Sequence, residues 1–156
     1  MSVLRNGTSP RELTNTNPTI NIRTASAADV LAIADFWQLC EMVTEFNDPL
    51  QDLSFALSFS TSTVLIGEEP NGRIVGTVMV GHDGHRGNLY YLAVAQDLRC
   101  RGIGRRLVAS AEGWLCEMGI RKIHLLVLND NAEVRGFYEK LGYGIGPAIL
   151  MRKWLT

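Results

Sequence analysis

Apolar residues recur along the first part of the chain at spacings that change from strand-like to helical. A short β-branched run over residues 19–23 predicts a strand. Residues 26–42 then place apolar side chains every three or four positions, which is the spacing of one helix face. The polar turn at residues 47–49 ends that pattern and predicts a second, shorter helix over residues 50–59.

Three apolar and β-branched runs follow, at residues 63–68, 73–81 and 87–95. The sequence Pro-Asn-Gly separates the first two, and Asp-Gly at positions 83–84 separates the last two. Asp-Gly is a favoured two-residue hairpin loop because both positions tolerate positive φ. The pattern therefore predicts three consecutive antiparallel strands.

The last third of the chain returns to helical spacing. Apolar residues between Leu107 and Met118 predict a helix that stops at Gly119, and residues 122–128 predict a buried strand. A capping-box spacing opens another helix over residues 130–142, and residues 143–155 have room for one or two final strands. This order of elements predicts an α+β, or mixed α/β, layer fold around one sheet.

A chain of 156 residues with 46% hydrophobic and 20% charged residues fits one packed domain, which we expect over residues 19–156. Residues 1–18 lack an apolar leader core and predict a flexible polar tail. Cys40, Cys100 and Cys116 are odd in number and widely spaced, so they favour neither disulfides nor a metal site. With no apolar run long enough to span a membrane, we expect a cytoplasmic protein.

The formal net charge of −1 hides two halves of opposite sign. Residues 24–72 hold eight acidic residues and no lysine or arginine, whereas residues 99–156 hold ten basic and five acidic residues. We expect the first half to attract cations and the second to attract anions, with a solvated acidic helix face as the alternative. The small net charge and the lack of interleaved aromatic residues argue against nucleic-acid binding.

The stretch DLRCRGIGRRL, residues 97–107, crowds four arginines and two glycines into eleven positions. It lies between a predicted strand and a predicted helix, so unpaired N–H groups at the helix start would face outward. Arg105 and Arg106 are unfavourable there, by up to about 1 kcal/mol each, unless an anion is bound. No Gly-Lys-Ser/Thr follows, which excludes a Walker A loop. Position 107 is leucine instead of glycine, which excludes the Gly-x-Gly-x-x-Gly dinucleotide-binding loop. A phosphate-binding turn is the favoured interpretation, and a solvated basic turn is the alternative.

The same stretch, Arg99 to Gly104, resembles the Gln/Arg-x-x-Gly-x-Gly/Ala loop of motif A in the GNAT superfamily of N-acetyltransferases. The stretch NDNAEVRGFYEKLGY, residues 129–143, resembles motif B of that superfamily. The segment FNDP and residues 76–94 are similar to uncharacterised bacterial YpeA-type acetyltransferases. The resemblance implies a mostly antiparallel sheet of six to seven strands, splayed between strands 4 and 5, with helices on both faces.

It also implies an acetyl-CoA site without a metal. Pantetheine would pair with the bulged fourth strand and the pyrophosphate with the loop amides. The implied cofactor-binding residues are Leu92, Ala93, Val94, Arg99, Cys100, Arg101, Gly102, Ile103, Gly104, Arg105, Asn131 and Tyr138. Asn131 is equally a candidate helix cap.

Direct acetyl transfer needs an N–H for the oxyanion, an acid for the thiolate and a neutral amine. A main-chain N–H at or near Leu92 would supply the first, and the resemblance makes Tyr138 the acid, with core packing as its alternative role. Some relatives carry a glutamate base where this chain has Leu126. The remaining base candidates are Glu41, Glu45, Asp48, His82, Asp83, His85, Tyr90 and Tyr91, or ordered water alone.

The acidic first half predicts a cationic amine acceptor: a protein or peptide amine, a polyamine or an amino-sugar. Candidate acceptor-binding residues are Trp37, Glu41, Asp48, His85 and Tyr90. Homodimers are frequent among similar proteins, so a homodimer is one expectation for the assembly. A non-catalytic acyl-CoA binding or regulatory module is the alternative to an enzyme.

Overall fold

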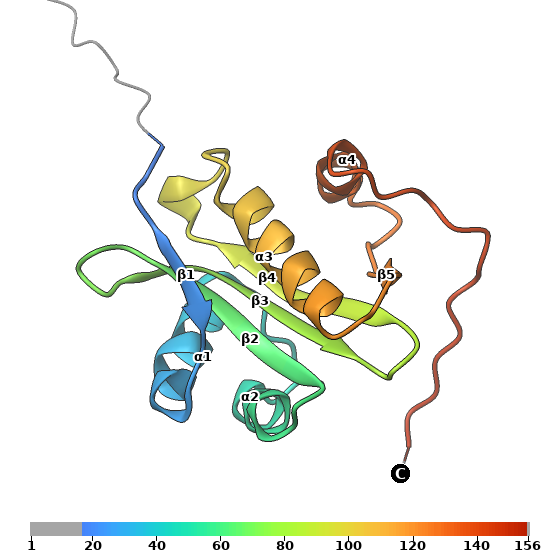
Figure 1. Ribbon diagram of the computed structural model, residues 1–156, viewed down its shortest axis with the longest axis horizontal. Coiled ribbons are helices and arrows are strands. Elements are labelled where there is room, and N and C mark those ends of the chain that lie inside the picture. Colours follow the sequence, from blue (N-terminus) through green and yellow to red (C-terminus); the bar gives the residue numbers. More distant parts are fainter. Residues whose placement is uncertain (1–16, 156) are drawn as a thin grey trace, which may run out of the picture.

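The computed structural model describes residues 17–155, in which five strands form one sheet whose spatial order follows the chain (Figure 1). The strands are β1 (Asn21–Thr24), β2 (Ser62–Glu68), β3 (Ile74–His82), β4 (Gly87–Val94) and β5 (Ile123–His124). The helices are α1 (Val30–Leu39), α2 (Pro49–Ser58), α3 (Ile103–Glu117) and α4 (Ala132–Lys140), with 3-10 turns η1 (Ala27–Asp29) and η2 (Gln96–Leu98). Neighbouring strands are antiparallel except β4 and β5, which are parallel.

Helices cover both faces of this sheet. The helices α1 and α2 pack on one face and α3 packs on the other, while α4 lies towards the same edge of the molecule as β5 (Figure 1). Three consecutive residues of β2, Val64 to Ile66, are buried, because a strand covered on both faces hides every side chain. None of the helices in the described part of the chain is long and apolar enough to cross a membrane.

Two glycines let α3 lie close against the sheet. A Cβ on Gly76 would come 2.7 Å from Cδ1 of Leu107, and one on Gly87 would meet Leu115. Both leucines are buried on the inner face of α3. This close packing fixes where α3 begins and therefore where the preceding arginine-rich loop is presented.

The predicted mixed α+β class, with helices on both faces of a mostly antiparallel sheet, is confirmed. The predicted count of six to seven strands is wrong for residues 17–155, which form five. Residues 122–128 contribute only the short β5, because the chain leaves β4 after His124. The expected tail at residues 1–18 lies outside the described residues except for 17 and 18.

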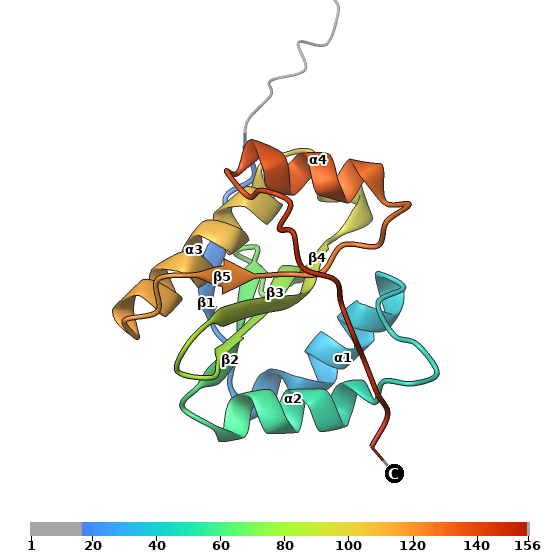
Figure 2. The same cartoon turned by 90° about the vertical axis from the view of Figure 1, so that its right-hand side faces the viewer.

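The C-terminal segment, residues 143–155, forms none of the expected strands. It runs from the end of α4 past β5 towards the α1–α2 side of the molecule (Figure 2). Near its end, the ring of Trp154 lies 5.5 Å from that of Phe46 in the α1–α2 connection. The segment therefore spans the edge of the molecule where β4 and β5 separate.

The predicted two-residue hairpin loop between β3 and β4 is also wrong. His82 pairs with Gly87, which leaves a loop of residues 83–86. The Oδ1 atom of Asp83 accepts hydrogen bonds from the N–H groups of His85 (2.8 Å) and Arg86 (2.7 Å). Asp at this position therefore builds a longer loop through its side chain, in the manner of an Asx turn.

Candidate active site

A β-bulge interrupts β4 near its middle. Thr77 pairs with Ala93 and Met79 pairs with Tyr90, so one residue more lies on β4 than on β3. Tyr91 adopts φ 50°, a left-handed conformation that is strained for a residue with a side chain. The bulge falls at Tyr91 and Leu92, at the start of the Leu92–Val94 stretch to which the resemblance assigned it.

Buried groups hold this strained residue in place. The indole N–H of Trp37 donates to Oγ1 of Thr77 (2.9 Å), and that hydroxyl donates to the carbonyl of Tyr91 (3.0 Å). The rings of Trp37 and Tyr91 stack with centroids 3.9 Å apart and an interplanar angle of 7°. Trp37 and Thr77 are 0% exposed, so their hydrogen bonds replace water that cannot reach them.

The sheet opens between β4 and β5. Only Gly87 with Ile123 and Asn88 with His124 pair across it. From Leu89 onward β4 has no strand partner on that side within the described residues. The unpaired main chain beyond Asn88 is therefore available to hydrogen-bond an extended ligand.

The arginine-rich loop follows directly. Gly102 caps α3 with φ 78°, and Cys100 also has a positive φ, of 61°. The first N–H to bond within the helix region belongs to Arg106, which donates to the carbonyl of Gly102 (3.1 Å). The N–H groups of residues 103–105 precede that bond, which gives the electropositive helix start expected from the sequence.

The four arginines of this stretch have different partners. Arg106 donates to the carbonyl of Ile20 at 2.9 Å and so ties α3 to the chain before β1. Arg99 makes a long contact of 3.4 Å from Nε to the carbonyl of Val94. Arg101 and Arg105 are exposed and form no ion pair with a carboxylate in residues 17–155. They are the cations left to meet an anionic ligand.

A further ion pair braces the chain ahead of the loop. Arg73, in the β2–β3 connection, contacts both carboxylate oxygens of Asp97 in η2, at 2.8 and 3.1 Å. Arg73 and Asp97 lie 24 positions apart in the sequence, so no local signal announces the pair.

Tyr138 lies on α4 with 8% of its surface exposed, between the rings of Phe137 and Tyr143. Burial raises the pKa of its hydroxyl to about 12. The hydroxyl forms no hydrogen bond with residues 17–155. Asn131 caps α4, its Oδ1 atom accepting from the N–H of Val134 at 3.1 Å, so the structure supports the capping role for this residue.

A cavity of about 560 Å³ lies between α2 and the strands β3 and β4. Its lining residues are Asn47, Asp52, Phe55, Ala56, Phe59, Thr61, Ser62, Met79, Val80, Gly81, His82, Asp83, Asn88, Tyr90 and Tyr91. It contains two carboxylates and neither lysine nor arginine. The phenol of Tyr91 donates to Asp52 (2.6 Å) and accepts from the amide of Asn47 (3.0 Å).

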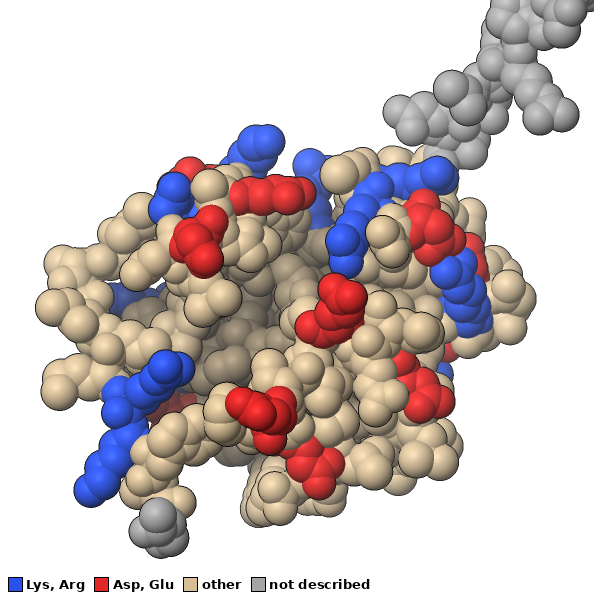
Figure 3. Space-filling model, turned by 180° about the vertical axis from the view of Figure 1, so that it is seen from behind, with Lys and Arg blue, Asp and Glu red and all other residues tan. Residues whose placement is uncertain are grey.

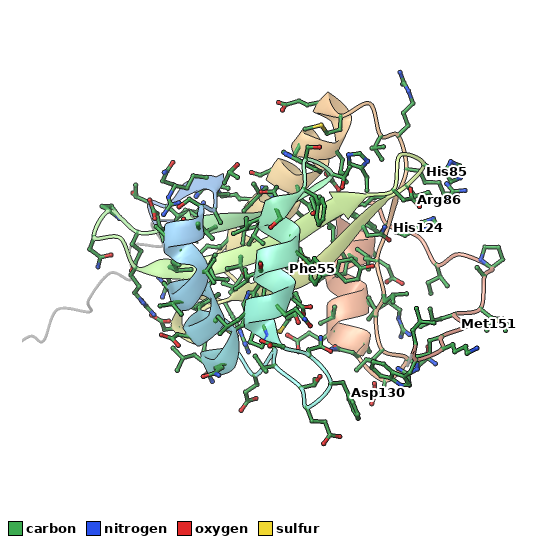
Figure 4. The ribbon with its side chains drawn as sticks, turned by 90° about the horizontal axis from the view of Figure 1, so that it is seen from below. Phe55, His85, Arg86, His124, Asp130 and Met151 are labelled. Carbon is green, nitrogen blue, oxygen red and sulfur yellow. The ribbon has the colours of Figure 1, made fainter. Side chains whose placement is uncertain are left out.

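Of the acceptor-binding residues expected from the sequence, only Tyr90 lines this cavity. Trp37 is fully buried behind Tyr91, and Asp48 caps α2 through the N–H groups of residues 50 and 51. Glu41 is exposed in the α1–α2 connection, and His85 lies at the tip of the β3–β4 hairpin (Figure 4). Sequence reasoning missed Asp52, because one aspartate in an amphipathic helix carries no signal of its own.

The acidic first half is also less anionic than its sequence indicates. Arg23 pairs with Asp29 (2.8 Å) and Glu68 (3.0 Å), and Arg73 pairs with Glu69 (3.4 Å). These pairs involve three of the eight carboxylates counted in residues 24–72. The hydrogen bonds from Arg23 hold the pKa of Asp29 well below its usual range.

A larger cavity, about 850 Å³, lies between residues 125–129, α4 and the C-terminal segment. Tyr138 lines it, but no residue of β4 or of the arginine-rich loop does. The molecule seen from behind shows a hollow of mainly uncharged atoms with both acidic and basic side chains around it (Figure 3). No group of three or more His, Cys, Asp or Glu residues within 17–155 is arranged to hold a metal ion.

The strand β4 thus carries a bulge, loses its β5 partner beyond Asn88 and leads into an electropositive loop and helix start. The family described as Acetyltransferase (GNAT) family matches residues 31–143. The chain is 41% identical over 136 residues to an acetyltransferase of Pectobacterium atrosepticum, covering 87% of this chain and 96% of that protein. It is 37% identical over 136 residues to an acetyltransferase of Yersinia enterocolitica, with the same coverage of both chains.

Solved structures share the fold at low identity. AAC(6')-Iy in complex with a CoA bisubstrate analogue superposes with a TM-score of 0.74 at 18% identity, covering 88% of this chain and 99% of that one. Glucosamine-6-phosphate N-acetyltransferase of Arabidopsis thaliana gives 0.68 at 22% identity, covering 88% and 99%. The chain therefore belongs to the GNAT family of acetyltransferases, and acetyl-CoA is its acetyl donor.

Proposed function

We propose that the protein transfers the acetyl group of acetyl-CoA directly to a positively charged primary amine, in the cleft on either side of the β4 bulge. The observation that carries this proposal is the position of the bulge. On one side lie the split from β5 and the arginine-rich loop, and on the other lies the cavity that contains Asp52. One strand thus joins a donor side to an acceptor side.

On the donor side, the pyrophosphate binds the free N–H groups of residues 101–105, assisted by the side chains of Arg101 and Arg105. Pantetheine extends along β4 beyond Asn88, where that strand has no partner. Supporting this assignment, both arginines are exposed and free of ion pairs within residues 17–155. An anion there also removes the unfavourable interaction between Arg105 and the helix dipole.

The acetyl oxygen accepts a hydrogen bond from the N–H of Leu92. A bulge removes main-chain groups from the hydrogen-bond ladder of the strands. The bonds from Trp37 to Thr77 and from Thr77 to the carbonyl of Tyr91 hold the β4 bulge in place. A donor that is already oriented stabilises the oxyanion without reorganisation during the reaction. The attacking amine approaches from the acceptor side.

Tyr138 acts on the leaving sulfur as a hydrogen-bond donor. Its pKa of about 12 lies well above the ordinary thiol value of about 8.5, so complete proton transfer to the thiolate is unfavourable. The phenol keeps its proton at neutral pH and can donate it in a hydrogen bond. The thiolate then takes its proton from solvent or from the ammonium product.

No side chain stands out as a dedicated base. Leu126 is 66% exposed at the position where some relatives carry a glutamate. Glu41, Glu45 and Asp48 do not line the acceptor cavity. His82 does, but its Nδ1 atom already accepts a hydrogen bond from the N–H of Gly84 (3.1 Å). We therefore assign deprotonation of the amine to water within the cavity.

The acceptor side favours an amine because its cavity holds carboxylates and no positive side chain. Two proteins of the same fold are named for amino-sugar substrates, one an aminoglycoside N-acetyltransferase and the other a glucosamine-6-phosphate N-acetyltransferase. Both names describe acetylation of an amine.

The test is a screen of primary amines with acetyl-CoA, with release of free CoA as the measured signal. We expect CoA release that depends on the amine. Binding of acetyl-CoA, seen as a raised melting temperature, without release across peptide amines, polyamines, amino-sugars and arylalkylamines would instead indicate a regulatory acyl-CoA module.

A further inference from the structure

The acceptor cavity has features that narrow the class of amine. Phe55 lies in the last turn of α2 and Phe59 follows directly after the helix; they are 59% and 58% exposed, and Tyr90 across the cavity is 49% exposed. Figure 4 shows Phe55 on α2, which crosses in front of the strands. Three large rings exposed around one cavity indicate a surface that an apolar ligand covers.

The two carboxylates of the cavity differ in what they can offer. Oδ1 of Asp83 already accepts two main-chain N–H groups of its own loop, which lower its pKa. Asp52 receives one hydrogen bond, from Tyr91 to Oδ2, and its Oδ1 atom has no partner within residues 17–155. Each carboxylate therefore keeps one oxygen without a partner within residues 17–155, but Asp52 is held by a side chain at the β4 bulge, whereas Asp83 is held by its own loop.

Asp52 is also held in a fixed orientation. Tyr91 uses its hydroxyl proton on Asp52 and accepts from Asn47, and its ring is stacked on the buried Trp37. Burial, followed by the bond to Asp52, raises the pKa of Tyr91 to about 12, so the phenol remains a donor at neutral pH. A carboxylate oriented in this way binds a cation with little loss of side-chain freedom.

Two of the other polar side chains of the cavity are already engaged within the protein. Ser62 donates its hydroxyl to the carbonyl of Ala56 (3.0 Å), and Asn47 is bound to Tyr91. A polyamine would have to place a second ammonium group beside Asp83 or among the exposed rings, whereas a monoamine needs Asp52 alone. A sugar needs several free donors and acceptors, whereas Phe55 and the other exposed rings form an apolar wall.

We infer that the acceptor is a primary monoamine with an apolar, aromatic or aliphatic body, whose ammonium group binds Asp52 and whose body lies between Phe55, Phe59 and Tyr90. This inference rests on the proposed acetyl transfer and specifies its substrate class. The cavity volume of about 560 Å³ is in the range of small-molecule sites. Asp52 and Tyr91 are positioning and specificity residues in this assignment.

The first experiment compares kcat/KM for 2-phenylethylamine, spermidine and glucosamine with the full-length protein. We expect 2-phenylethylamine to exceed the other two by about tenfold or more, in line with the discrimination that apolar pockets achieve. A preference for spermidine or glucosamine would overturn the substrate class while leaving acetyl transfer established. If none of the three amines releases CoA, the wider amine screen tests acetyl transfer. The substrate class is then tested by measuring whether 2-phenylethylamine binds.

Binding is measured by calorimetry of 2-phenylethylamine in the presence of CoA. Asp52→Asn is expected to raise its Kd and its KM by about tenfold or more, with a smaller change in kcat, because the lost charge positions the amine. The control Asp35→Asn removes an exposed carboxylate of α1 outside the cavity and should leave both unchanged. Equal affinity in wild type and Asp52→Asn, or no binding by the wild type, would refute the assignment.

Phe55→Ala provides a second test of the substrate class that leaves the hydrogen bonds of Trp37, Thr77 and Tyr91 intact. The ring is exposed, so we expect the variant to fold, with KM for 2-phenylethylamine about fivefold higher and KM for ethylamine little changed. Equal effects on the two amines would show that the ring does not contact the body of the acceptor.

Discussion

The two sides of the β4 bulge differ in how they are encoded. The proposed donor side is one continuous stretch, β4, the arginine-rich loop and α3, and the groups proposed to bind the anion are main-chain amides and two exposed arginines. The acceptor side gathers α2, both long strands of the hairpin and the α1–α2 connection. A binding function that uses main chain and local charge can be read from sequence, whereas one assembled from distant side chains cannot.

The largest loss of stability is expected from a change at the β4 bulge, which lies between the two sides. Trp37→Ala removes a fully buried ring, its stack on Tyr91 and its hydrogen bond to Thr77. We expect a loss of about 3–5 kcal/mol in the free energy of unfolding, measured with urea. Leu39→Ala, at an 84% exposed position near the end of the same helix, should change stability by less than about 0.5 kcal/mol. Similar losses in both variants would show that Trp37 does not support the bulge.

On the donor side, Tyr138→Phe is expected to lower kcat by about 100-fold with little change in acetyl-CoA affinity. The variant removes the hydrogen bond to the leaving sulfur but keeps the ring between Phe137 and Tyr143. Steady-state kinetics and calorimetry measure the two quantities separately. Unchanged turnover would remove the tyrosine from the mechanism.

The arginines allow a test between adjacent positions. Alanine at both Arg101 and Arg105 should raise the Kd of CoA by about tenfold in low salt, and by less as salt screens the exposed charges. Arg106→Ala should instead lower stability by about 1 kcal/mol, through its lost bond to Ile20, and leave CoA affinity unchanged. Equal effects of the two replacements on CoA binding would contradict the division among the arginines.

The smallest loss of stability is expected from a change at Asp29, a carboxylate of the acidic first half that pairs with Arg23. Asp29 has a folded-state pKa below its unfolded value of about 3.9, so its stabilisation is present above about pH 4 and is lost as pH falls further. Asp29→Asn should cost about 1 kcal/mol at neutral pH and flatten the loss of stability below pH 4. Urea denaturation across that pH range measures both, and an unchanged acid limb would contradict the role of the Arg23 pair.

Much of the fold follows from patterns within single segments. The helical spacings and β-branched runs located α1 to α4 and β1 to β4 because each depends on neighbouring residues. The strand predicted at residues 122–128 was mostly wrong because apolar alternation cannot tell whether a partner strand is present. Ile123, Leu125 and Val127 are still partly buried, so the alternation survives where the ladder ends.

The site divides in the same way. The glycines and arginines of residues 99–105 predict an anion-binding turn through a local conflict with the helix dipole, and this stays a prediction. Trp37 was expected to contact the acceptor, but it is fully buried behind Tyr91, a tertiary relation that its sequence position does not reveal. The free oxygen of Asp52 depends equally on tertiary contacts. A cytoplasmic location and a homodimer stay predictions.

The most direct test of the two-sided cleft is the set of backbone amide NMR shifts as CoA is added. If CoA binds as proposed, the largest shifts occur at residues 101–105 and along β4 from Leu89 to Val94. Shifts gathered instead around residues 125–129 and the C-terminal segment, with the arginine-rich loop unmoved, would place the cofactor in the larger cavity and contradict the proposal.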